Sequence, residues 1–200
     1  MRIAYKACTG ALALAGLGAV LCSAQLGVQP PAPSPAETPA VTSAELHAAE
    51  RACDRSIREY GYDSSVEAII PTHGARVEGY GVVFVADVNM APLPLLYGFG
   101  GSVNKRDLAN VHEAKRKKTG AMRAVAIKML GEAAKSLPHL GDDQMVVVKI
   151  GFFYLDFEDR SGLPDSLTAQ ARKRDAIEFA AGRLTGLDAT ARIQVRVDAQ

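Results

Sequence analysis

Residues 144–156 read QMVVVKIGFFYLD, a nearly unbroken run of β-branched, aromatic and other apolar residues. Such residues favour extended backbone, and an apolar run without alternation is typical of a strand covered on both faces. The run therefore predicts the central strand of a sheet. Residues 80–88, YGVVFVADV, also carry apolar side chains on both sides, and they predict a second strand covered by helices or by a second layer.

A long helix is predicted between these two strands, over residues 107–137. Pro138 and Gly141 follow it and would end it. Its apolar side chains recur at helical spacing: Val111, Met122, Val125, Met129, Leu130 and Ala133. A strand, a helix and a strand in this order predict a right-handed crossover between parallel strands.

The other predicted elements lie on either side of this unit. A short strand at 66–70 is stopped by Pro71 and followed by a turn at 72–75. A helix is predicted over 166–182, and alternating residues at 192–197 predict a closing edge strand. The order is an N-terminal helix and then β-β-α-β-α-β. We expect one small α/β domain, or an α+β variant of it, with a mixed sheet and helices packed on it.

The N-terminus has the features of an export signal. Arg2 and Lys6 precede the uncharged run ALALAGLGAVL at 11–21, and small residues follow up to Ala24. A positive start, an apolar stretch and a small-residue cleavage site in this order are typical of a secretory signal peptide. We predict that residues 1–24 are removed and that the protein is periplasmic or secreted.

Two other readings of this segment were weighed. A transmembrane anchor needs about 20 apolar residues, more than the run at 11–21 supplies, so no transmembrane span is predicted after cleavage. A lipoprotein acylated at Cys22 is the second alternative. It is less favoured because a lipobox places a small residue directly before the cysteine, and Leu21 stands there.

A linker and a helix lead into the domain. Residues 25–42 are rich in proline and alanine, which favours an extended spacer. Thr42 and Glu45 have the spacing of a capping box, so an amphipathic helix is predicted over 43–61, ending at a glycine. We expect this helix to dock on the α/β domain at 62–200 or to pair with another chain.

Composition excludes several function classes. The chain is 48% hydrophobic and 22% charged, as globular domains are. Its formal net charge is +1, and signal cleavage would remove two of 23 basic residues and none of 22 acidic ones. The near-neutral balance predicts no nucleic-acid partner. Cleavage also leaves Cys53 as the one remaining thiol, which predicts no internal disulfide and a small apolar role on a helix face, or a bond between chains.

An apolar loop is the first candidate binding surface. Prolines and glycines make residues 89–106 irregular, yet this segment contains Leu95, Tyr97 and Phe99. Together with Tyr80, these side chains predict a surface that either packs back on the domain or contacts a partner.

A basic run is the second candidate. Lys115, Arg116, Lys117 and Lys118 form a basic patch that would suit an anionic partner. Four consecutive residues wrap around a helix, however, which favours an ordinary solvated surface.

Candidate catalytic residues are sparse. His73, in the predicted turn, is the most site-like histidine, and Asp156 lies with Glu158, Asp159 and Asp165 after the central strand. Ligands of α/β folds often bind at the carboxyl end of a strand, so these acids could bind a cation such as calcium. The alternative is that they form an ordinary solvated turn before the next helix. CxxC, HxxxH, GxSxG and a complete GxGxxG do not occur, so no cofactor and no metal site are predicted.

The chain resembles a group of secreted bacterial proteins of uncharacterised function. The likeness rests on the Gly79–Phe84 segment, the Gly141-Asp142-Asp143 turn and the Arg174-Asp175 pair, and it would cover residues 64–198. The resemblance implies export and a compact α/β domain. It implies no activity.

Two function classes follow. The favoured prediction is an exported non-enzymatic domain that binds a partner, an envelope protein or itself, or takes part in envelope assembly. The alternative is a small hydrolytic or metal-dependent enzyme that uses His73 with the acids near Asp156. Convergence of His73, Tyr80 and Asp156 in one pocket would favour the enzyme.

Overall fold

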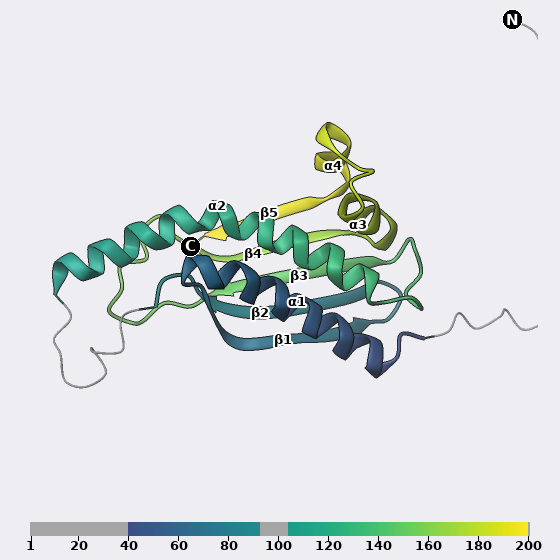
Figure 1. The fold of residues 1–200 in the computed structure, drawn as a ribbon, viewed down its shortest axis with the longest axis horizontal. Helices are drawn as coiled ribbons and strands as arrows, with labels where there is room; N and C mark the ends of the chain where they lie inside the picture. Colours follow the sequence, from purple (N-terminus) through teal and green to yellow (C-terminus); the bar gives the residue numbers. More distant parts are fainter. Residues whose placement is uncertain (1–39, 93–103, 200) are drawn as a thin grey trace, which may run out of the picture. The chain divides into compact units, whose positions relative to one another are not determined.

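The computed structural model describes residues 40–92 and 104–199 (Figure 1). The predicted signal peptide, most of the linker, and Leu95, Tyr97 and Phe99 lie outside these residues. In chain order the elements are α1 (Ser43–Ser64), β1 (Glu67–Val77), β2 (Gly81–Asn89), α2 (Lys105–Lys135), β3 (Met145–Phe152), β4 (Pro164–Arg172), α3 (Lys173–Ala180), α4 (Gly186–Arg192) and β5 (Gln194–Ala199).

The five strands form one mixed sheet in the order β1-β2-β3-β4-β5. β2 and β3 are parallel, from Gly81 opposite Met145 to Val88 opposite Phe152, and the other neighbours are antiparallel. α2 joins the two parallel strands, so the predicted crossover is confirmed, and β3 is the central strand as expected. The α/β class with helices packed on a mixed sheet is confirmed as well.

One face of the sheet, called here the inner face, carries the hydrophobic core. α1 and α2 lie side by side against it (Figure 1). Alternate residues of β2, β3 and β4 point to this face, because successive side chains of a strand alternate between faces. Phe84, Val148 and Ala169 form one cross-strand row and are fully buried. α2 contributes the fully buried Met122, Ala126, Met129, Leu130 and Ala133.

The helix predicted at 166–182 is wrong over its first half. Pro164–Arg172 is β4, paired antiparallel with β3, and α3 begins only at Lys173. Leu167 and Ala171 are buried, as predicted, but they lie on a strand. Residues four apart share a face in a strand as well as in a helix, so this pair fits both periods.

The short strand predicted at 66–70 is longer than expected, and the turn at 72–75 is wrong. β1 continues through Pro71, where its register against β2 shifts. Proline is tolerated there because β1 is an edge strand with a bulge. α1 supports this irregular stretch, since the Thr72 and Gly74 amides donate to Asp54 Oδ1 and Glu50 Oε1, each at 2.8 Å.

α1 begins at the predicted capping box and runs three residues past the predicted end at Gly61. It stops at Ser65, which has φ 56° and whose amide donates to the Gly61 carbonyl at 3.0 Å. Cys53 is buried in its core-facing side, as expected of a small apolar residue.

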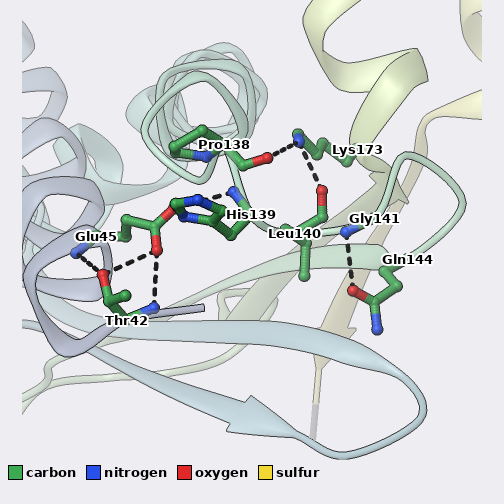
Figure 2. Close-up of polar contacts among 8 residues, drawn as sticks. All are labelled: Thr42, Glu45, Pro138, His139, Leu140, Gly141, Gln144 and Lys173. Atoms are coloured by element: carbon green, nitrogen blue, oxygen red, sulfur yellow. Dashed lines mark hydrogen bonds and ion pairs between the residues drawn. The ribbon is translucent and has the colours of Figure 1, made fainter. Parts of the chain in front are cut away.

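The turn after α2 connects the start of α1 with the start of α3. The Glu45 carboxylate of the capping box also accepts from the His139 amide, at 3.0 Å (Figure 2). Two carbonyls of the same turn, those of Pro138 and Leu140, accept hydrogen bonds from Nζ of Lys173 of α3 at 3.1 and 2.6 Å. These bonds satisfy acceptors that follow a helix C-terminus and tie α1, α2 and α3 together.

Candidate binding surface on the outer face of the sheet

The residues predicted to form an enzyme site do not converge. His73 lies on β1 opposite Val85, which in turn lies opposite Lys149 of β3. Asp156 comes after the end of β3, beyond Phe152, so β2 and several residues of chain separate it from His73. Tyr80 lies at the opposite end of the sheet, where its carbonyl accepts from the Met145 amide at 2.9 Å.

The acids near Asp156 surround a pocket of about 550 Å³ after the carboxyl end of β3. Asp156, Glu158, Asp159 and Asp165 all line it. Across residues 40–92 and 104–199, no group of three or more His, Cys, Asp or Glu side chains is placed to hold a metal ion. The Ser161 side chain and amide lower the pKa of Asp159, which is therefore engaged by its own turn.

Beside this pocket, Lys115 of α2 is fully buried and makes an ion pair with Glu158. Its Nζ donates to Glu158 Oε2 at 2.5 Å and to the Phe153 carbonyl at 3.1 Å, and it lies 4.8 Å from the centre of the Tyr154 ring. Burial lowers the pKa of Lys115, against the opposing effect of Glu158. No exposed atom of this lysine is available to a substrate, so the pair positions α2 against the loop after β3.

Two other side chains with reactive groups, those of Tyr154 and Cys53, are also buried within the fold. Burial raises the pKa of Tyr154 to about 12, and its hydroxyl donates to the Pro164 carbonyl at 2.5 Å. Burial likewise raises the pKa of Cys53 to about 12, which keeps its thiol protonated at neutral pH. Neither group has the access or the ionisation that a nucleophile needs.

The predicted basic patch does not exist as one surface. Lys115 is buried, and Lys118 donates to the Met90 carbonyl at 2.7 Å while partial burial lowers its pKa. Arg116 and Lys117 are exposed and both pair with Glu113, at 2.8 and 3.5 Å. The helix turns successive residues to different sides, so two of the four lysine and arginine side chains serve the fold.

The outer face of the sheet, opposite α1 and α2, is the better candidate surface. On β1, β2 and β3 one row across this face is apolar, with Ala75, Val83 and Val147. In the next row Val85 lies between His73 of β1 and Lys149 of β3. The expectation that β2 is fully covered on both faces is not met, because Val85 is 41% exposed. The part of the outer face around Val83 and Val85, called here the apolar half, is accessible and bordered by polar side chains.

The other half of the outer face, on β4 and β5, is polar and basic. Gln170 lies opposite Gln194, and Thr168 lies opposite Arg196. The Gln170 side chain donates to Gln194 Oε1 at 2.8 Å. Two neighbouring pockets, of about 320 and 520 Å³, share these glutamines as lining residues. The face therefore offers apolar contact on one side and hydrogen-bonding groups on the other.

Sequence reasoning missed the polar half because it assigned residues 166–172 to a helix. The signal was present: Ser166, Thr168, Gln170 and Arg172 alternate with Leu167, Ala169 and Ala171. Period-two alternation over seven residues is the signature of a half-buried strand. Among the predicted site residues that the structure describes, His73 lies on this face.

No protein-family model, curated protein or solved structure matches the chain. The resemblance suggested by Gly79–Phe84 therefore stays a prediction. Within residues 40–92 and 104–199, no helix combines the length and hydrophobicity needed to cross a bilayer. Function is accordingly argued from the outer face.

Proposed function

We propose that the protein is an exported, non-enzymatic binding domain that contacts its partner through the outer face of its sheet. The observation that carries this proposal is the accessible face itself. It places half-exposed valines of β2 beside a hydrogen-bonding surface on β4 and β5. Apolar area flanked by polar groups is the usual composition of a protein-binding surface.

The chemistry of the buried groups supports binding over catalysis. An enzyme needs an acid, a base or a nucleophile that reaches the substrate. Lys115, Tyr154 and Cys53 are buried and bonded within the fold, and His73 and Asp156 lie on different parts of the sheet. The alternative hydrolytic or metal-dependent role therefore has little support from the described residues. The predicted contact surface with Leu95, Tyr97 and Phe99 lies outside the described residues and stays a separate prediction.

A site-specific photo-crosslinker tests the proposal in the cells that make the protein. Placed at Val85, at the centre of the apolar half, it should yield a discrete product of higher mass on irradiation. Placed at Arg123, an exposed residue of α2 on the other side of the domain, it should yield no such product. A product at the mass of two chains would identify a second copy as the partner.

The two positions are matched in exposure and differ in the face they occupy. Equal products from Val85 and Arg123 would mean that contact is non-specific. No product from Val85, with the variant folded and exported, would overturn the proposed role of the outer face.

A further inference from the structure

The larger pocket on the polar half is walled by arginines from three consecutive elements. Arg172 ends β4, Arg174 is in the first turn of α3, and Arg192 ends α4. All three line the pocket of about 520 Å³, together with Gln170 and Gln194. A cavity of this size accommodates a ligand of several residues or a small molecule.

Two of these arginines converge on one carboxylate oxygen. Arg172 Nη1 lies 3.6 Å and Arg174 Nη1 lies 3.0 Å from the same Oδ1 of Asp143. The Asp143 side chain is 76% exposed, and exposed ion pairs contribute little to stability. The pair of guanidinium groups is therefore already arranged around a carboxylate that another carboxylate can replace at small cost.

The third arginine, Arg192, makes an ion pair with a buried aspartate. Arg192 Nη1 lies 3.2 Å from Oδ1 of Asp175, whose side chain is only 8% exposed. A buried partner fixes the guanidinium at the pocket wall, which reduces the side-chain entropy lost when a ligand binds. The pocket thus combines one fixed arginine with two that have a displaceable partner.

Charge and hydrogen bonding around the pocket favour a single carboxylate. Three arginines and one aspartate, Asp175, line the pocket, so basic side chains outnumber acidic ones there. No aromatic side chain lines either of the two neighbouring pockets, so sugar rings have no stacking surface there. Glutamine amides match the donors and acceptors of peptide groups.

We propose that this pocket binds the free C-terminal carboxylate of a peptide, with the preceding peptide groups on the Gln170–Gln194 side. Arg172 and Arg174 would bind the carboxylate in place of Asp143. The inference rests on the proposed binding role of the outer face and names the ligand chemistry for it.

A titration of the purified, isotopically labelled protein followed by NMR tests this inference. The probe is N-acetyl-dialanine with a free carboxylate, and the matched probe is its C-terminal amide. The acid should shift the side-chain Nε–Hε signals of Arg172 and Arg174, and the amide should leave them unchanged. Inorganic phosphate in a third titration separates carboxylate recognition from binding of any anion.

Variants at the pocket should change affinity in opposite directions. Arg174→Gln should weaken binding of the acid by about tenfold, because it removes one charged hydrogen-bond donor. Asp143→Asn should tighten binding several-fold, because it removes the competing carboxylate. Arg116→Gln, in the exposed pair with Glu113 on α2, is the control and should leave binding unchanged.

Several results would overturn the inference. These are equal binding of the acid and the amide, stronger binding of phosphate at the same arginines, or no change in Asp143→Asn. Any of these results would reject the carboxylate site alone, and the proposed function would still be supported if the crosslinker at Val85 gave its product. Conversely, loss of that product with intact binding of the acid would reject the proposed partner contact and keep the carboxylate site.

Discussion

Lys115 shows that a run of basic residues in the sequence need not form a basic surface in the fold. It stands in a run of four basic residues, yet it is fully buried and bonded to Glu158. Glu158 is itself 5% exposed, and its second oxygen has no hydrogen-bond partner among the described residues. Such a pair specifies one arrangement of α2 and the loop after β3, because either partner alone would be a buried, uncompensated charge.

The stability of single and double variants tests this role. Lys115→Met should lower the free energy of unfolding by about 3–5 kcal/mol, since it leaves Glu158 buried without its partner. The double variant Lys115→Met with Glu158→Leu should recover most of that loss. Urea unfolding measures both, with Arg116→Met as the exposed control, expected to unfold at nearly the same urea concentration as the parent protein. A Lys115→Met variant as stable as the control would contradict the interpretation.

The burial of this lysine was partly readable from the sequence. Val111, Lys115, Lys118 and Met122 are spaced four, three and four residues apart, so they share one helix face. This spacing places both lysines on the core-facing side of α2, whereas the basic run was predicted to be a solvated surface. It did not indicate the acceptors, because Glu158 and the Phe153 and Met90 carbonyls come from distant segments.

At the scale of whole elements, α1 is attached to the domain by several of its carboxylates, among them that of Glu50 described above. Glu45 joins its first turn to the turn after α2, and Asp54 binds the Thr72 amide and hydroxyl of β1 at 2.8 and 2.7 Å. α1 docks on the domain, as the first of its two predicted alternatives states, through contacts with α2 and β1. Pairing with another chain stays a prediction. The helix covers the part of the sheet next to the edge strand.

The attachment at Glu45 should depend on pH. Hydrogen bonds from the His139 and Thr42 amides lower the pKa of Glu45 to about 2. Because the folded-state pKa lies below the ordinary value of about 4.3, the stabilisation is complete above that value and is lost as the pH falls toward 2. Glu45→Gln should therefore lower Tm by about 2–4 °C at pH 7, for a bond worth about 1 kcal/mol.

The same variant should differ much less from the parent protein near pH 2, where the carboxyl is protonated in the unfolded state and about half protonated in the folded state. Thermal unfolding between pH 7 and pH 2 follows the difference. Glu78→Gln, in the exposed turn between β1 and β2, serves as the control at each pH. A Tm difference for Glu45→Gln that is constant over this range would show that its ionisation has no part in the attachment.

An element of this fold was predictable from the sequence where the spacing of its apolar residues fits only one kind of secondary structure. The apolar run at 144–156 and the long periodic segment at 107–137 gave β3 and α2 almost in full. β4 was missed because its alanines favour a helix and Leu167 with Ala171 fits either period. With β4 misassigned, the polar half of the outer face and its arginine pocket had no place in the predicted sheet.

At the scale of the whole molecule, the two faces of the sheet differ in burial and in composition. The inner face is filled by α1 and α2 and accounts for the core, whereas the outer face keeps half-exposed valines and basic residues accessible. A two-layer domain leaves one face of its sheet open to solvent whatever its function, so this asymmetry alone does not indicate binding. What supports the proposed binding role is that the open face combines half-exposed valines with an arginine-lined pocket.

Export is the last prediction, and it concerns the chain ahead of the domain. Cleavage after Ala24 removes no residue of the described structure, whose first core contact is made by Val41, so the domain is complete in the processed protein. The protein recovered from a periplasmic or extracellular fraction should have Gln25 at its N-terminus and an intact mass without residues 1–24. Ala24→Arg should retain the precursor, because the cleavage site requires a small residue. Cys22→Ala should be processed normally, whereas a block there would reveal a lipoprotein, and recovery from the cytosol with Met1 attached would reject export altogether.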